Sequence, residues 1–338
     1  MSGIAAVRAR GRRRTLRITG VVAGVALVVA VVALMVGDYA LTPAGVARAL
    51  TGAGTPIEQY VVTQVRLPRL TMALVCGAML GLAGALLQTL LRNPLASPDL
   101  LGISGGASVA AVFATLVLGL PAWGVTGFAF LGGLVVAAIL LGAARRLADG
   151  GYRIVLAGVG ISFLCAAVIG YLIKRAQVND AQSAFIWITG SFGATLWRDV
   201  LILAVVLALC VPAAVAAGRV LPVVELGDPS AMGLGVRPAL VRTGVVAIAV
   251  LLAAATTAFI GPVAFIALGA PAMARSLVGR GSPALGTSAV LGAAILVAAD
   301  LIAQHALPGM SVPVGVVTGA IGAPYLLWLL ATSKGTRV

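Results

Sequence analysis

The sequence predicts an all-α protein that crosses a membrane about ten times. Of its 338 residues, 61% are apolar and only 9% are charged, and its mean hydropathy is +1.13. Globular domains usually carry about 25% charged residues, so this composition is that of a polytopic membrane protein. A bilayer core of about 30 Å needs about 20 apolar residues per helix. Segments of this kind lie at 18–36, 67–91, 100–119, 122–144, 153–174, 197–217, 239–258, 262–279, 284–304 and 313–331.

The first predicted span is interpreted as a retained helix. Residues 1–17 form a basic segment before it, as in a signal peptide. However, the apolar run 18–36 is longer than the apolar region of a signal peptide, and no clear small-residue cleavage site follows. An arm that binds RNA is the competing interpretation of the basic segment. Six arginines before a first span are ordinary, so we expect no nucleic acid partner.

The lysines and arginines predict the orientation, because cytoplasmic loops carry most of them. With ten spans and the N-terminus inside, seventeen of these residues are cytoplasmic and six are outside. The count predicts a multi-pass protein of the cytoplasmic membrane whose two termini, including the tail 332–338, are cytoplasmic. The cytoplasmic set is Arg8, Arg10, Arg12, Arg13, Arg14, Arg17, Arg92, Arg145, Arg146, Arg153, Arg219, Arg237, Arg242, Arg275, Arg280, Lys334 and Arg337, and the outer set is Arg48, Arg66, Arg69, Lys174, Arg175 and Arg198.

Several kinds of chemistry lack the residues that they need. A Walker A loop ends in Gly-Lys-Ser/Thr, and neither Lys174 nor Lys334 stands in that sequence. The single histidine, His305, excludes paired-histidine zinc motifs. The three cysteines lie in separate apolar segments without C-x-x-C spacing, which is typical of buried thiols. We therefore predict no catalytic residue, no metal site and no cofactor bound by this chain.

The one acid well inside a predicted span is Asp300. A charged carboxylate at a helix centre costs about 2.5–3.5 kcal/mol on insertion scales. It could belong to a proton or cation relay, or it could be hydrogen-bonded to a neighbouring helix. A relay would bring further acids or histidines to membrane depth. The sequence lacks them, which favours the structural role.

Small residues recur inside the spans, as in Gly77-x3-Gly81-x2-Gly84. Because small residues let transmembrane helices approach closely, we interpret them as packing positions in a tight bundle.

The segment 88–107, QTLLRNPLASPDLLGISGGA, interrupts two apolar runs with polar residues, prolines and glycines. Lipid cannot satisfy an irregular backbone, so this segment must lie in water or against protein. In the predicted orientation it joins the second and third spans on the cytoplasmic face.

A series of motifs follows in order along residues 60–331. R-L-P-R begins at Arg66, R-N-P-L-A-x-P at Arg92, L-G-D-x2-A-x2-L-G-V at Leu226, G-P-V-A-F-I-A-L-G-A-P-A-M-A-R at Gly261, and P-V-G-V-V-T-G-A-I-G-A-P-Y at Pro313. Together they resemble the FecCD family, the permease subunits of type II ABC importers for ferric siderophores, haem and cobalamin. The resemblance implies the type II ABC importer permease fold, with residues 18–331 as a single transmembrane domain.

The resemblance also implies partners. Two ABC ATPase subunits would carry ATP and magnesium on the cytoplasmic side, and an extracellular substrate-binding lipoprotein would deliver the ligand. A second permease copy or a homologue would complete the path through the membrane lipid. The cargo would be a ferric siderophore or a related chelate, moved by alternating access.

The stretch 221–238 matches the pair of short cytoplasmic helices that docks on the ATPase in this family. Asp228 before Pro229 predicts a helix start with a capping side chain, and the apolar residues of the stretch, Met232 among them, are expected to fill a groove on the partner. A polar turn is the alternative interpretation. The predicted coupling residues are Glu225, Leu226, Gly227, Asp228, Ala231, Leu234 and Gly235.

Two further sites follow from the resemblance. Arg66 and Arg69 lie on one side of a helical turn and are expected to pair with acidic residues of the binding protein, with snorkelling at the membrane interface as the alternative. Asn93 and Leu95 are expected at the cytoplasmic gate, with a contribution from the turn 149–152.

Three positions depart from the family pattern. Ala272 follows Pro271 where the family often has His, Gln304 stands where many members have Arg, and Ser311 stands where Glu is common. Docking is therefore expected to rest more on Arg66 and Arg69.

Three functions stay open at this point. The first is the permease of an ATP-driven importer for a metal chelate. The second is an ion- or proton-coupled secondary carrier, which needs intramembrane charge pairs that the sequence largely lacks. The third is an assembly protein of the membrane without transport of its own.

Overall fold

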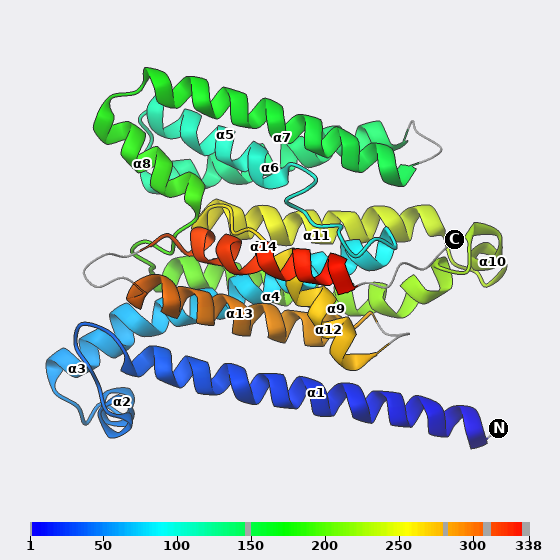
Figure 1. Ribbon diagram of the computed structural model, residues 1–338, viewed down its shortest axis with the longest axis horizontal. Helices are drawn as coiled ribbons and strands as arrows, with labels where there is room; N and C mark the ends of the chain where they lie inside the picture. The colour runs from blue at the N-terminus through cyan, green and yellow to red at the C-terminus, as the bar shows by residue number, and fades with distance from the viewer. Residues whose placement is uncertain (1, 146–149, 280–282, 307–311, 333–338) are drawn as a thin grey trace.

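The computed structural model describes residues 2–145, 150–279, 283–306 and 312–332, which form a bundle of helices (Figure 1). Ten helices coincide with the predicted spans: α1 (Ser2–Met35), α4 (Leu67–Leu90), α5 (Ile103–Leu116), α6 (Ala122–Arg145), α7 (Gly150–Arg175), α9 (Trp197–Val224), α11 (Pro238–Ile260), α12 (Ile266–Val278), α13 (Leu285–His305) and α14 (Val314–Thr332). Among the described residues, seven helices are long and apolar enough to cross a membrane, while α5, α12 and α14 supply shorter apolar helices. The prediction of an all-α polytopic membrane protein is confirmed.

The bundle has two distinct ends (Figure 1). One end, here called the α10 end, carries α10 (Asp228–Gly233), the start of α1 and the connection from α4 to α5. The opposite end, called the α2 end, carries α2 (Pro43–Leu50), α3 (Pro56–Tyr60) and α8 (Val178–Thr189). These three short helices were not among the predicted spans.

The two short helices before α4 start with strong caps. The Thr42 side chain accepts from the Gly45 N–H at 3.1 Å, with Pro43 at the first helical position. Thr55 and Glu58 form a capping box, in which each side chain bonds the other residue's backbone N–H. Such caps satisfy the N–H groups that a helix start leaves free, so helices form here although each is too short to span a bilayer.

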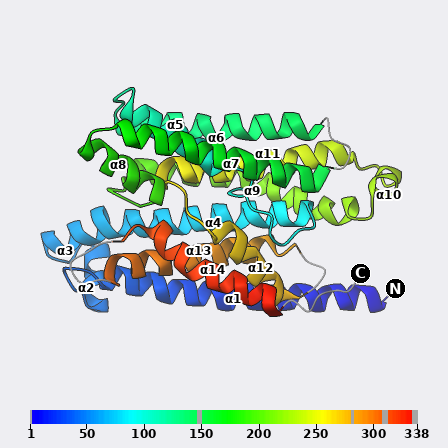
Figure 2. The same ribbon diagram turned by 45° about the horizontal axis from the view of Figure 1, so that its top comes forward.

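Helix α4 is the centre of the bundle and packs against α13, α11, α12 and α9 (Figure 2). In the most apolar part of the span that contains α4, 78% of the residues are buried inside the protein. The corresponding buried share for α7 is 11%. Between α3 and α4 lies a π-helical segment, η1 (Val61–Arg66). The Trp197 Nε1–H donates to the Thr63 carbonyl within it at 2.9 Å.

Glycines allow the closest contacts of α4. A Cβ atom at Gly77 would come within 2.4 Å of the Gly292 carbonyl oxygen on α13, and one at Gly81 within 2.2 Å of the Ser288 oxygen. A Cβ atom at Gly84 would come within 1.7 Å of the Ala267 oxygen on α12. The spacing Gly77-x3-Gly81-x2-Gly84 is therefore a packing motif, as the sequence predicts.

Candidate functional site

The α4–α5 loop at the α10 end is held by its own side chains. The Asn93 Oδ1 accepts from the Leu95 N–H at 2.9 Å, and the Asn93 N–H donates to the Gln88 carbonyl at 3.2 Å. Asn93 and Leu95 are both partly buried. The two predicted gate residues thus lie together in one turn that Asn93 stabilises. The other predicted part of the gate, the turn at 149–152, begins at a residue outside the described ranges.

Asp99 continues this loop toward α5. The Ser104 hydroxyl donates to the Asp99 Oδ1 at 2.5 Å. Burial raises the pKa of the Asp99 carboxyl, and the hydrogen bond from Ser104 acts in the opposite direction. Gly102 is the N-cap residue of α5 and has a φ of 74°, a left-handed conformation that glycine adopts without strain.

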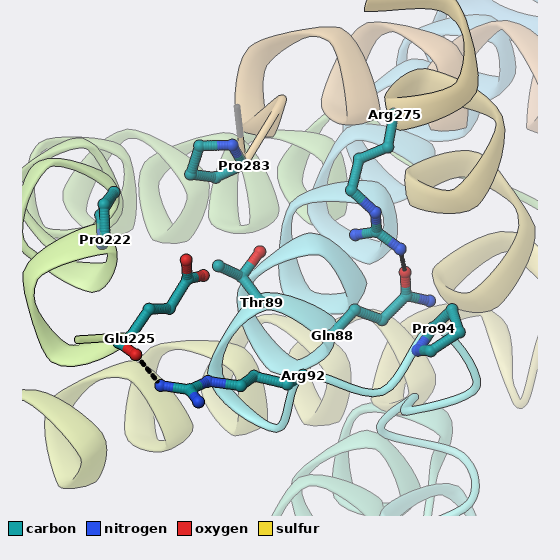
Figure 3. Close-up of a pocket in the computed structure, with 8 residues that line it drawn as sticks. All are labelled: Gln88, Thr89, Arg92, Pro94, Pro222, Glu225, Arg275 and Pro283. Carbon is teal, nitrogen blue, oxygen red and sulfur yellow. Dashed lines mark hydrogen bonds between the residues drawn. The ribbon is translucent and has the colours of Figure 1, made fainter. Parts of the chain in front are cut away.

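A pocket of about 520 Å³ lies beside this loop (Figure 3). Gln88 links two helices there, because its Nε2 donates to the Leu268 carbonyl at 3.0 Å and its Oε1 accepts from the Arg275 Nη2. The Arg275 Nη1 is buried and has no hydrogen-bond partner among the described residues. The residues that line the pocket are Gln88, Thr89, Arg92, Pro94, Pro222, Glu225, Arg275 and Pro283.

The Arg92 side chain crosses this pocket and donates from Nη2 to the Glu225 main-chain carbonyl (Figure 3). It thereby joins the α4–α5 loop to the end of α9. Sequence reasoning treated Arg92 only as an orientation residue. No local pattern signals a contact between residues 133 positions apart.

The predicted coupling stretch 221–238 differs from the expected pair of short helices. Helix α9 extends to Val224, and a single short helix, α10, follows. The prediction that Asp228 caps this helix is wrong, because Gly227 is the N-cap residue and no side-chain cap bond forms. The Asp228 carboxylate instead accepts from the Arg242 guanidinium at 2.6 and 3.0 Å. This ion pair fastens α10 to α11.

The tip of this stretch presents apolar side chains. Leu226, Met232 and Leu234 are 64%, 60% and 65% exposed, and Gly235 takes a φ of 79° that turns the chain back toward α11. Ala231 is fully buried. It therefore supports the tip from within, and the expectation that it faces a partner is wrong.

At the α2 end, Arg69 forms a two-pronged ion pair with Asp300 of α13. The Arg69 Nε donates to Oδ2 at 3.0 Å and the Nη2 to Oδ1 at 2.8 Å, while the Gln304 Nε2 donates to the same carboxylate at 2.8 Å. The Asp300 side chain is only 7% exposed. The structural role that the sequence favours for Asp300 is confirmed, and Gln304 is part of the same cluster.

Arg66 also makes its hydrogen bonds within the chain. Its Nη1 donates to the Leu34 carbonyl at 2.7 Å and its Nη2 to the Tyr39 carbonyl at 2.6 Å. Arg66 thus ties the end of α1 to the start of α4. Ser311, the third departure from the family pattern, lies outside the described residues.

The long apolar helices and the two unlike ends are those of a polytopic membrane protein. In a solved metal-chelate-type ABC transporter in an inward-facing conformation, one chain superposes with a TM-score of 0.83 and 27% identity, over 93% of this chain and 99% of that one. Residues 25–332 match the sequence model of the FecCD transport family. The chain belongs to the FecCD transport family.

Two relatives illustrate the range of this family. The chain is 35% identical, over 95% of its length and 96% of the relative, to the Fe(3+)-citrate import system permease protein YfmE of Bacillus subtilis. It is 36% identical, over 87% of its length and 89% of the relative, to the ferric enterobactin transport system permease protein FepG of Escherichia coli.

Proposed function

We propose that this chain is the permease subunit of an ATP-driven importer that carries a ferric siderophore or a similar metal chelate. The observation that carries the proposal is the family match over residues 25–332 in a bundle of the same fold as a metal-chelate-type ABC transporter. Ferric citrate and ferric enterobactin are the ligands in the names of two relatives that align over 95% and 87% of this chain, whereas a vitamin B12 permease protein that is 37% identical aligns over 82%. An iron chelate is proposed as the cargo on these longer alignments.

The α10 end is proposed to face the cytoplasm and two ABC ATPase subunits. The start of α1 with its arginines, the α4–α5 loop and α10 all lie at this end, and the positive-inside rule places basic ends in the cytoplasm. The exposed leucines 226 and 234 and Met232 suit insertion into an apolar groove, because burying an exposed leucine stabilises an interface by about 1.5–3 kcal/mol. ATP and magnesium would bind to the ATPase subunits.

The external binding protein is proposed to dock on the α2 end. Arg69 uses Nε and Nη2 on Asp300, which leaves its Nη1 for an acidic residue of a partner, and its side chain is 27% exposed. Arg66 has both Nη atoms engaged. Of the two arginines that the sequence predicts for docking, Arg69 is therefore the one proposed to bind the external protein.

A secondary carrier gains no support from the one intramembrane acid. The Asp300 carboxylate is paired with Arg69 and hydrogen-bonded to Gln304, which is a structural arrangement. A proton relay is built from a chain of acids or histidines at membrane depth, and the sequence places Asp300 there without further acids or histidines.

The coupling surface can be tested by co-purification of this chain with the proposed ABC ATPase subunit. We expect a Leu226→Asp/Leu234→Asp variant to lose the ATPase, because two charges cannot enter an apolar groove. Ile57→Asp is the matched control, since Ile57 is 62% exposed on α3 at the opposite end. Retention of the ATPase by the double variant would contradict the proposed surface.

The gate is tested with a cysteine at Asn93. If two permease copies meet at a gate there, a crosslink between them should form in at least one nucleotide state. Its absence in every nucleotide state would count against a gate at the axis of the dimer.

A further inference from the structure

The end of α9 depends on Arg92 for one of its terminal carbonyl groups. A helix leaves its last carbonyls without intrahelical partners. Here the Leu221, Val223 and Val224 carbonyls accept from the N–H groups of the three residues that follow the helix, 225–227. The Glu225 carbonyl accepts from the Arg92 guanidinium. A cation at this place also matches the negative end of the helix dipole.

The backbone of Arg92 closes the C-terminal end of α4, where the Arg92 and Asn93 N–H groups donate to the Thr89 and Gln88 carbonyls at 3.4 and 3.2 Å. Its φ is 49°, in the left-handed region that few residues other than glycine adopt. From this turn the exposed Arg92 side chain lies over the pocket, with its guanidinium directed to the main chain of α9 (Figure 3).

The Arg92 contact connects two parts of the proposed transporter. On one side of Arg92 is the turn of Asn93 and Leu95, which Asn93 stabilises. On the other side, Glu225 is followed directly by the exposed apolar tip and by α10, which Arg242 fastens to α11. Because the guanidinium bonds a main-chain carbonyl, the contact follows the backbone at the end of α9 and does not depend on the side chain of residue 225.

We propose that Arg92 is the positioning residue that transmits movement of the α9–α10 segment to the α4–α5 loop. This inference rests on the proposed function, in which the segment meets an ATPase and the loop carries the gate. Arg92 acts by keeping the loop in register with the end of α9, so that both shift together.

The test uses the full chain with its ATPase subunit and binding protein in proteoliposomes, and it measures ATP hydrolysis and ferric chelate uptake in parallel. We expect Arg92→Ala to assemble and hydrolyse ATP near the wild-type rate, while uptake per ATP falls on the order of tenfold, as for the loss of one charge-assisted hydrogen bond. Arg92→Lys, which keeps a charged donor, should recover part of the ratio. The control is Arg219→Ala, an exposed arginine of α9 that has no hydrogen bond or ion pair among the described residues.

Two results would overturn the proposal. One is a wild-type ratio of uptake to hydrolysis in Arg92→Ala. The other is loss of assembly in Arg92→Ala and Arg92→Gln alike, which would make Arg92 a residue of folding only. Failure of the wild-type chain to take up any ferric chelate with its ATPase would refute the proposed function instead, so the two failures are distinguishable.

Discussion

The Arg69–Asp300 pair shows how a buried charge is held inside this bundle. Asp300 is nearly buried, and its carboxylate receives donors from Arg69 and Gln304. A buried carboxylate that loses its cation is strongly destabilising, by about 3–5 kcal/mol. The pair therefore anchors α4 to α13 at the α2 end.

We expect Arg69→Ala to lower the thermal stability of the purified chain sharply, because it leaves Asp300 buried and unpaired. The double variant Arg69→Gln/Asp300→Asn removes both charges and keeps hydrogen-bonding groups, so its melting temperature should return close to the wild-type value. Thermal unfolding in detergent measures both. If the single variant is as stable as the wild type, the ion pair contributes nothing.

The same double variant separates folding from docking. If the Arg69 Nη1 meets an acidic residue of the binding protein, the double variant should assemble with the ATPase but lose stimulation by that protein. Full stimulation would show that Arg69 is structural alone.

Asp99 gives a prediction about pH. Its raised pKa means that the folded chain holds this proton more tightly than the unfolded chain does. The contribution of Asp99 to stability is then most favourable at low pH and declines as the pH rises from about 4 through the folded pKa. Asp99→Asn removes this titration. When the free energy of unfolding is measured against pH, the stability of the variant relative to the wild type should therefore increase as the pH rises. Asp180→Asn, which changes an exposed acid of α8, should show no such trend.

At the scale of helices, close backbone contacts limit what α4 accepts. We expect Gly84→Ala to destabilise the bundle by about 1–3 kcal/mol or more, because its Cβ would lie 1.7 Å from the Ala267 oxygen. Gly160→Ala is the control on α7, where a Cβ meets open space. There alanine should be neutral or stabilising, since it is the better helix former. Equal thermal stability of the two variants would contradict the packing.

The existence of each long helix could be predicted from the sequence, because a membrane span needs a long apolar run. The start of α1 could not, since arginine is a good helix former and the helix continues through the basic segment to Ser2. The threonine caps at Thr42 and Thr55, each followed by proline, are sequence patterns that predict the starts of α2 and α3. A search for apolar spans does not find them, because both helices are short. The π-helical turns of η1 depend on contacts such as that of Trp197 with Thr63, which no local pattern encodes.

The candidate site was predictable only in part for the same reason. The loop with Asn93 and Leu95 stands out as a polar interruption in an apolar chain. The partners of Arg69 and Arg92 lie 231 and 133 positions away and that of Asp228 lies 14 positions away, beyond the turn of one helix, so sequence reasoning assigned each charge a role without its contact. For Asp228 that role was wrong, because Arg242 takes the carboxylate that would have capped the helix.

At the scale of the whole molecule, the two ends should lie on opposite sides of the membrane. A cysteine at Val178, which is 83% exposed on α8, should react with a membrane-impermeant maleimide on intact cells, whereas one at Leu234 should react only after the membrane is opened. The native thiols of Cys76, Cys165 and Cys210 are buried and give a low background. Labelling of both positions from outside would contradict the orientation.

The central claim is that this chain imports a ferric chelate only together with an ATPase. The most direct measurement is uptake of radiolabelled iron, as a ferric siderophore, into proteoliposomes that hold the chain, its ATPase subunit and ATP, with the binding protein outside. The account predicts accumulation that requires both ATP hydrolysis and the permease chain. Uptake that proceeds without ATP and follows an imposed proton gradient would contradict it.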